Sequence, residues 1–209
     1  MRVIKADDYQ TWFIEEGGFG VLIDPWLDKK LNPESSILLQ RERQTTSSLS
    51  QKELDQVKVA IVTAPFIDHL HIPSIKKLNN KVKIITTKKV RKILIRNQID
   101  NPITCIDNQV MEVGPFKLSV FPAGFPYSWS AFCFFLENTE GKTIFHEGHM
   151  ANFLKLKRLK RKCDAVLITL DKVKFLGIIT LSMGPKEGFK TARLLDSKRI
   201  MATGTQPNE

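Results

Sequence analysis

Short apolar segments alternate with turn residues along this chain, which restricts it to folds built from short strands and helices. Residues 2–6, 9–15 and 19–24 have strand patterns, and Glu16-Gly17-Gly18 between the last two indicates a hairpin. Pro25 should end the third strand because proline has no amide hydrogen to donate. The polar residues 28–51 predict a long loop, either without regular structure or with one helical turn.

The remaining segments mix the two periodicities. Strands are predicted at 57–63, 82–86, 103–106, 109–113, 116–121, 131–137, 142–146, 164–170 and 199–203, and helices at 72–78, 88–98, 152–162 and 185–195. The pattern shows neither a fixed repeat nor a linker, so we expect a single domain over residues 1–209. This order predicts an α+β fold with two sheets flanked by helices.

Composition and cysteine usage indicate the class of protein. Hydrophobic residues make up 42% of the chain and charged residues 26%, which is typical of a globular protein. The three cysteines, Cys105, Cys133 and Cys163, form no C-x-x-C motif, which argues against a zinc knuckle and favours a reducing, cytoplasmic location. The first residues lack a signal-peptide pattern, and no apolar run approaches the about 20 residues that span a bilayer, so we expect no membrane partner.

The net charge of +10 has two interpretations. It can indicate an anionic partner such as nucleic acid, lipid or a metabolite, or lysines that only solvate the surface. The basic segment 155–162 has the same ambiguity. Because aromatic residues are not interleaved with its charges, we favour a solvated helix whose apolar residues, Phe153, Leu154, Leu156 and Leu159, turn inward.

The four histidines form two close pairs, each directly after a predicted strand. His69 and His71 follow the strand 57–63, and His146 and His149 lie at the end of the strand 142–146. Ligands collect at such strand ends in layered α/β folds, and imidazole binds zinc, iron and nickel. Neighbouring Asp68 and Glu147 add carboxylates. The pattern predicts a metal site, or else neutral histidines that line a pocket.

Several segments resemble the metallo-β-lactamase superfamily, in the branch of L-ascorbate-6-phosphate lactonase-like metal-dependent hydrolases. Residues 12–27, ending in Asp24-Pro25-Trp26-Leu27, are similar to that branch's early hairpin and Asp-Pro-Trp turn. Residues 59–69 resemble the strand that leads into the motif His-x-His-x-Asp-His, and 141–149 the strand that ends in Gly-Asp. Met183-Gly184-Pro185-Lys186-Glu187 resembles the start of a late helix, and residues 199–204 the last strand.

The chain departs from this family at most ligand positions. Ala64 and Phe66 stand where the motif has its first two histidines, whereas Asp68 and His69 match it. His149 replaces the bridging aspartate, and Gly204 the final histidine. A variant group with an Asp-Asp-His-x-His motif and a Glu-Pro-His-Gly-like segment, which also lacks the full ligand set, looks similar to residues 68–71 and 146–149.

The resemblance implies a four-layer αββα sandwich and a hydrolase of esters, lactones or phosphoesters whose site is degenerate and at most mononuclear. Its ligands for one divalent ion, Zn or else Mn or Fe, would come from His69, His71, His146 and His149. Asp68 or Glu147 would act as the general base.

Five further residues are expected to line the pocket: Asp24, Trp26, Phe66, Tyr127 and Trp129. The alternative is a catalytically inactive module that holds no metal. Such a module would bind an anionic small molecule or, as the less favoured partner, nucleic acid.

Overall fold

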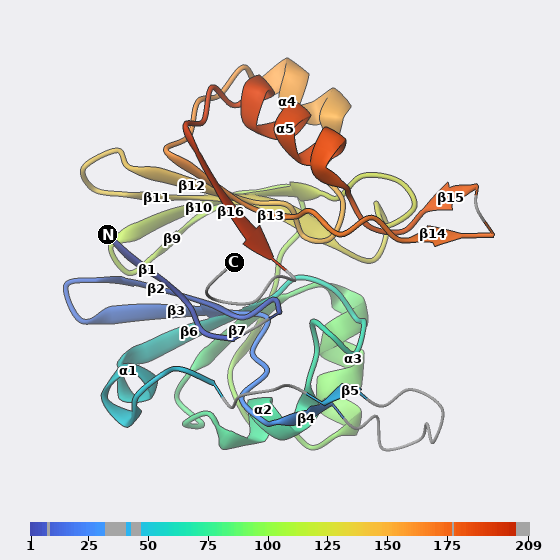
Figure 1. The fold of residues 1–209 in the computed structure, drawn as a ribbon. Coiled ribbons are helices and arrows are strands. Elements are labelled where there is room, and N and C mark those ends of the chain that lie inside the picture. Colours follow the sequence, from blue (N-terminus) through green and yellow to red (C-terminus); the bar gives the residue numbers. More distant parts are fainter. Residues whose placement is uncertain (8, 32–40, 43–46, 177, 204–209) are drawn as a thin grey trace. The chain divides into compact units, whose positions relative to one another are not determined.

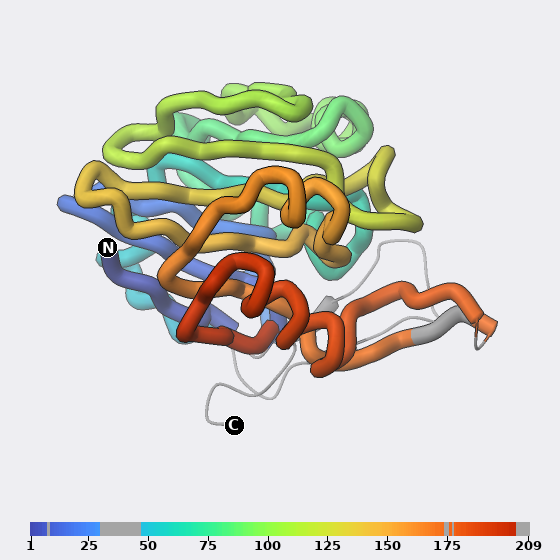
Figure 2. The backbone as a smooth tube through the Cα atoms, turned by 90° about the horizontal axis from the view of Figure 1, so that it is seen from above, coloured from blue at the N-terminus to red at the C-terminus, as the bar shows by residue number. Residues whose placement is uncertain are grey.

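The computed structural model describes residues 1–7, 9–31, 41–42, 47–176 and 178–203 (Figures 1 and 2). The described chain forms two compact units, the first from Met1 to Cys105 and the second from Ile106 to Thr203. Each unit contains one six-stranded sheet with helices. The single domain over residues 1–209 stays a prediction.

The sheet of the first unit has the order β1-β2-β3-β6-β7-β8. Its strands are β1 (Arg2–Lys5), β2 (Trp12–Glu16), β3 (Phe19–Ile23), β6 (Val57–Val62), β7 (Lys83–Thr86) and β8 (Ile103–Cys105). The first three strands pair antiparallel, and β3, β6, β7 and β8 pair parallel. Gly17 and Gly18 both have positive φ, +57° and +82°, as the tight turn of the predicted hairpin requires.

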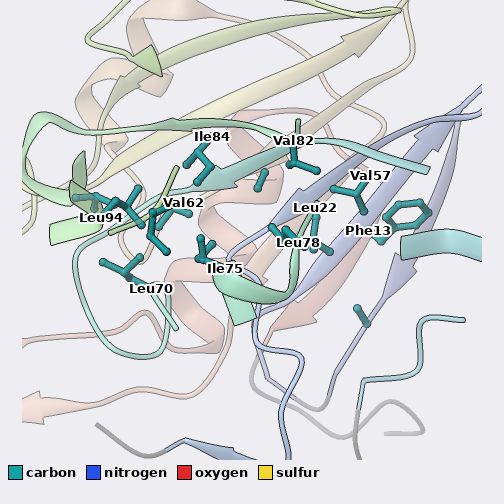
Figure 3. Close-up of a cluster of buried hydrophobic side chains, with 14 of the residues drawn as sticks. Phe13, Leu22, Val57, Val62, Leu70, Ile75, Leu78, Val82, Ile84 and Leu94 are labelled. Carbon is teal, nitrogen blue, oxygen red and sulfur yellow. The ribbon is translucent and has the colours of Figure 1, made fainter. Parts of the chain in front are cut away.

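Three helices connect the parallel strands and lie on one side of this sheet (Figure 1). They are α1 (Gln51–Gln56), α2 (Ile72–Lys77) and α3 (Lys88–Arg96). The inner side chains of α2 and α3, such as Ile75, Val90 and Leu94, are fully buried with strand residues of one face, among them Leu22 and Ile84 (Figure 3). Burying each of these side chains contributes roughly 1.5–3 kcal/mol, so this core is the main force that holds helices to sheet.

The sheet of the second unit has the order β16-β13-β12-β11-β10-β9. Its strands are β9 (Val110–Val113), β10 (Phe116–Pro122), β11 (Phe132–Asn138), β12 (Thr143–His146), β13 (Ala165–Thr169) and β16 (Arg199–Thr203). A meander from β9 to β12 is antiparallel, and β12, β13 and β16 are parallel. Helices α4 (Phe153–Leu159) and α5 (Pro185–Leu194) pack together on one side, with α5 on β13.

Parallel pairing positions the polar residues that follow the strands. In the first unit Ile23 of β3 pairs with Ile61 of β6, so the segments after both strands leave the sheet at the same edge. In the second unit His146 of β12 pairs with Leu167 of β13, with the same result. Both histidine pairs of the sequence therefore lie at carboxyl ends of parallel strands, as predicted.

The predicted strands and helices are present, with ends displaced by a few residues. Residues 32–40 and 43–46 of the predicted loop 28–51, as well as Gly204, lie outside the described residues. The rest of that segment is not all loop: β4 (Lys30–Leu31) pairs with β5 (Arg41–Glu42), and α1 begins at Gln51. The hairpin of β14 (Lys174–Phe175) and β15 (Ile179–Thr180), which extends away from the sheet of its unit, was not predicted (Figures 1 and 2).

Helix α4 corrects one detail of the sequence interpretation. Leu156 is buried, but Leu154 is 74% and Leu159 42% exposed, so the prediction that both turn inward is wrong. The helix has seven residues, of which only Leu156 is fully buried. None of the helices in the described ranges is long and apolar enough to cross a membrane.

Candidate functional site

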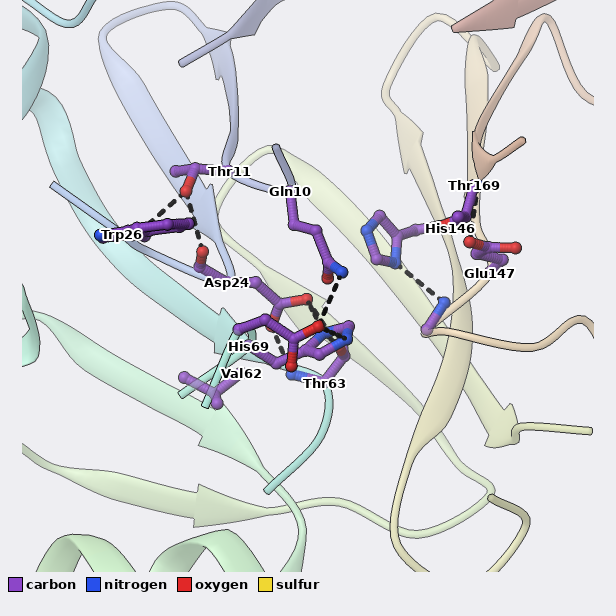
Figure 4. A network of polar contacts seen from close by, with 12 residues as sticks. Gln10, Thr11, Asp24, Trp26, Val62, Thr63, His69, His146, Glu147 and Thr169 are labelled. Carbon is purple, nitrogen blue, oxygen red and sulfur yellow. Dashed lines mark hydrogen bonds and ion pairs between the residues drawn. The ribbon is translucent and has the colours of Figure 1, made fainter. Parts of the chain in front are cut away.

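In the first unit, a buried carboxylate fixes the orientation of His69. Asp24 follows β3 with φ +44° and is completely buried, and its Oδ1 accepts the backbone N–H of Thr63 at 2.7 Å. Its Oδ2 accepts the Thr63 hydroxyl at 2.6 Å and lies 2.7 Å from Nδ1 of His69 (Figure 4). The Thr63 hydroxyl donates its proton to Asp24, and a carboxylate oxygen can only accept. His69 must therefore carry its ring proton on Nδ1 in order to bond to Asp24. The lone pair of His69 is then on Nε2.

Asp68 lies beside this nitrogen. His69 Nε2 is 3.9 Å from Oδ2 of Asp68, and the same oxygen accepts bonds of 3.2 Å from the Tyr9 hydroxyl and the Gln10 amide. The turn that begins at Phe66 brings the two neighbours together, because the N–H of His69 bonds to the Phe66 carbonyl at 2.9 Å. Asp68 is half-buried and His69 is buried.

His71 belongs to a separate set of contacts. Its Nδ1 is 2.7 Å from the Ser74 hydroxyl and 3.8 Å from Oδ2 of Asp28, and its ring lies near that of Trp26, with centroids 6.2 Å apart. Ser74 also accepts the N–H of Leu27 at 2.6 Å. These contacts connect the start of α2 to the segment after β3, which is a structural task. The predicted role of His71 as a metal ligand stays a prediction.

In the second unit, His146 has the opposite hydrogen-bond pattern from His69. Its Nδ1 accepts the backbone N–H of Gly148 at 3.1 Å, so a neutral His146 carries its proton on Nε2. The ring is buried and stacks on Phe134, its cross-strand partner, at 5.1 Å and 12°. In this state neither ring nitrogen offers a lone pair to an ion. His146 is therefore suited to donate a hydrogen bond rather than to bind a metal.

Glu147 is buried and joins the ends of two strands. Its Oε1 accepts the N–H of Thr169, the last residue of β13, at 2.6 Å, and its carbonyl accepts the Cys133 thiol at 2.8 Å. Burial raises the pKa of Cys133 far above its ordinary value, so this thiol stays protonated and donates. The contacts of Glu147 thus favour a structural role, and its predicted role as general base stays a prediction.

A tight turn presents His149. Gly148 has φ +57°, and a Cβ there would lie 1.7 Å from the carbonyl oxygen of Phe132. His149 itself has φ +93°, a conformation that costs a side-chain-bearing residue roughly 1–3 kcal/mol. Its half-buried ring meets that of Tyr127 edge-on, with centroids 4.5 Å apart. Because the surrounding fold maintains this backbone strain at His149, a residue that can bind a metal, the position is typical of a functional site.

The predicted pocket residues differ in their surroundings. Asp24 and Trp26 are buried, and Phe66 and Tyr127 are half-buried. Trp26 has its ring against Tyr9, and Phe66 has its ring 6.2 Å from that of His69. Trp129 is 95% exposed, so within its own unit it lines no enclosed space.

Sequence reasoning missed several partners of these residues. Tyr9, Gln10 and Thr63 contact the Asp24–Asp68–His69 cluster, Ser74 contacts His71, and Thr169 contacts Glu147. Thr63 and Thr169 carried a signal, each as a polar residue at the end of a buried strand. Tyr9 and Gln10 lie 59 and 58 residues from Asp68, which spacing along the chain does not reveal.

Two donor atoms of the first unit lie close enough together to bind one metal ion. Ligand atoms lie about 2.0–2.2 Å from zinc, so two atoms 3.9 Å apart, as in Asp68 and His69, can bind the same ion. Asp24 supports His69 in the way that carboxylates support metal-bound imidazoles. Ala64 and Phe66, which precede Asp68 in the same segment, have no donor atoms in their side chains.

Comparisons with known proteins agree with this fold. The chain matches solved structures of an isothiocyanate hydrolase from Delia radicum gut bacteria (18% identity, TM-score 0.76, covering 98% of this chain and 85% of that one). It also matches a possible metal-dependent hydrolase from Veillonella parvula (16%, TM-score 0.75, 97% and 86%). A third match is Igni18, a metallo hydrolase from Ignicoccus hospitalis (12%, TM-score 0.70, 98% and 83%). No curated protein matches the sequence.

The described sheets and helices together form the metallo-β-lactamase fold of these neighbours, which confirms the predicted fold class. The family model described as the beta-lactamase superfamily domain matches residues 4–204. The chain therefore belongs to the family of beta-lactamase superfamily domains.

Proposed function

We propose that this chain is a metal-dependent hydrolase with a single metal ion, acting on an ester, a lactone or a phosphoester. The observation that carries the proposal is the arrangement of Asp24, His69 and Asp68. Asp24 holds Nδ1 of His69, which directs the lone pair of Nε2 towards Asp68. A buried carboxylate that fixes the tautomer in this way is the arrangement that orients metal-bound imidazoles.

Asp68 and His69 are the first two proposed ligands. The proposed third ligand is His149, whose half-buried ring is held edge-on against Tyr127 at the strained turn after β12. His146 is left out because its Nδ1 accepts the N–H of Gly148. Histidine together with carboxylate suits Zn, Mn and Fe, of which Zn is proposed. A bound ion of this kind lowers the pKa of water towards about 7.

The residues around the proposed ligands orient them. Asp24 keeps the proton of His69 on Nδ1, while Tyr9 and Gln10 fix Oδ2 of Asp68. The carboxylate of Asp68, which is half-buried beside His69 Nε2, is also the proposed acceptor of a proton from water. For Glu147 we propose the structural role of joining β12 to β13.

The net charge and the free thiols support proposals about the substrate and the cellular compartment. A net charge of +10 supports an anionic small-molecule substrate, because a basic protein attracts anions. Cys105, Cys133 and Cys163 are free thiols, which supports a reducing, cytoplasmic compartment.

Metal analysis tests the proposal directly. Protein purified without chelator and offered Zn, Mn and Fe should contain one ion per chain by elemental analysis, and His69→Ala should lose it. His71→Ala is the matched control: it removes an equally buried imidazole that contacts Ser74 instead, and it should keep the ion. Hydrolysis of a panel of esters, lactones and phosphodiesters should fall together with the metal content. Wild-type protein that stays metal-free would rule the proposal out.

The second candidate is an inactive binding module. The residues that support it are Ala64 and Phe66. Ala64 is buried, and the Phe66 ring lies against His69. An apolar wall therefore occupies the place where two motif histidines would provide ligands. Metal-free protein that still binds an anionic small molecule would support this module instead of the hydrolase.

A further inference from the structure

Helix α3 has an unusual concentration of charge. Five of its nine residues are basic, namely Lys88, Lys89, Arg91, Lys92 and Arg96, and it contains no acidic residue. All five are exposed, and in the described part of the chain none of them takes part in an ion pair or a side-chain hydrogen bond. By contrast, the basic residues Lys77, Arg161, Lys162 and Lys172 all have carboxylate partners. The charge of α3 is thus available to a partner outside the chain.

These charges border a concave surface. Lys88, Arg91 and Lys92 are three and four residues apart, so they share one side of the helix. Together with Ile103 and Cys105 of β8 they line a hollow of about 390 Å³. Val90 and Leu94 on the opposite side are fully buried, which fixes the rotation of the helix and keeps the cations outward.

The charges also extend beyond this hollow. Arg96 is four residues after Lys92 and continues the row, so the basic side chains span eight helical steps, or about 12 Å. A single phosphate group would not fill this length, whereas one strand of a duplex places a phosphate about every 3.4 Å along its axis. Two of the five residues are arginines, whose planar guanidinium groups bind phosphate oxygens in pairs.

We propose that these five residues of α3, here called the basic strip, bind the phosphate backbone of a nucleic acid strand. The strip offers no aromatic side chain on which a base could stack, so recognition would be independent of sequence. This inference does not rest on the proposed hydrolase function, because the strip contains none of the proposed metal ligands.

The probe is a fluorescein-labelled single strand of about 30 nucleotides, used once as RNA and once as DNA. Fluorescence anisotropy measures its affinity for the protein at roughly 50 to 200 mM NaCl. The test variant is Lys88→Gln/Arg91→Gln/Lys92→Gln. The matched control, Lys155→Gln/Lys157→Gln/Arg158→Gln on α4, removes the same charge with the same substitutions. Circular dichroism checks that both variants fold, which is expected because none of the six residues is fully buried.

Wild-type affinity should fall steeply with salt. The α3 variant should lose at least about tenfold in affinity, and its slope of log affinity against log salt should shrink by roughly 2, since each phosphate contact contributes about 0.7. The α4 control should change much less. Equal losses in both variants would mean that only net charge matters and would overturn the proposal. Binding to phosphatidylserine vesicles but not to either strand would overturn it in favour of a membrane surface.

Discussion

The hydrogen bond at Nδ1 determines what each buried histidine can do. His69 donates from Nδ1 to Asp24, which leaves Nε2 able to bind a metal. His146 accepts at Nδ1 from the N–H of Gly148, which leaves a proton on Nε2. The two histidines lie at equivalent strand ends but have different partners at Nδ1. A carboxylate there leaves His69 able to bind a metal, whereas a backbone amide there makes His146 a hydrogen-bond donor.

Among the described glycines of the second unit, Gly148 is the one where an added Cβ would lie closest to another atom. Gly148→Ala should destabilise the protein by about 2–5 kcal/mol, because a Cβ would meet the Phe132 carbonyl oxygen at 1.7 Å and because alanine is strained at φ +57°. Gly141→Ala is the control, since it shares the positive φ but the added methyl group would meet no atom within 4 Å. It should cost only about 1–2 kcal/mol. Urea unfolding measures both, and equal losses would contradict the steric argument.

The sequence predicts much of this site but not its chemistry. The two histidine pairs were visible because each follows a buried strand. The tautomers were not, since the partner of His69 is 45 residues away and that of His146 is a backbone amide. Spacing along the chain carries no information about either bond.

At the scale of elements, buried apolar side chains outweigh unfavourable local charge in α3. Its like-charged pairs three and four residues apart each cost about 0.2–0.5 kcal/mol. Lysines at the N-terminal end also oppose the helix dipole. Burial of Val90 and Leu94 contributes roughly 1.5–3 kcal/mol each and keeps the segment helical. The amphipathic pattern therefore predicted α3 correctly in spite of its charge.

Helix α1 shows why short elements escape a pattern search. Its six residues contain no buried side chain, so hydrophobic periodicity gave no signal. The signal that was present is the capping box of Ser50 and Glu53, in which each side chain bonds to the backbone N–H of the other. The long polar segment before it concealed this motif.

This capping box makes part of the stability dependent on pH. The N–H of Ser50 holds the pKa of Glu53 below its ordinary 4.5, with further help from the Ser50 hydroxyl and Arg2. A carboxylate whose pKa is lower in the folded state stabilises the fold above its unfolded pKa, and this contribution disappears as pH falls through the folded value. Glu53→Gln should therefore lower the melting temperature at pH 7, and this deficit should shrink as the pH falls below 4.5.

Thermal melts between these pH values measure the difference. Glu140→Gln is the control, because Glu140 is exposed in a turn and its side chain has no hydrogen-bond partner in the described part of the chain. A deficit of Glu53→Gln that is independent of pH would show that the amide substitution, and not the lost charge, is responsible.

At the scale of the whole molecule, the two units repeat one design. Each sheet begins with antiparallel strands and ends with parallel ones, and each places a polar cluster after neighbouring parallel strands. In the first unit the cluster is built on Asp24 and His69, and in the second on His146 and Glu147. The family match over residues 4–204 includes both units.

Metal-dependent stability can show whether both units contribute ligands. Zinc at about 100 times its dissociation constant should stabilise the native state by about 2.7 kcal/mol. For a chain of this size that corresponds to a rise in melting temperature of roughly 5–11 °C, reversible by chelator. Binding of zinc to cysteines of the unfolded chain would reduce the shift, so the same scan on a variant with all three cysteines changed to serine sets the reference.

If His69→Ala and His149→Ala each abolish the shift, ligands come from both units. A shift that survives His149→Ala and disappears only in His69→Ala would confine the ion to the first unit, and no shift in the wild type would leave the inactive module as the better description.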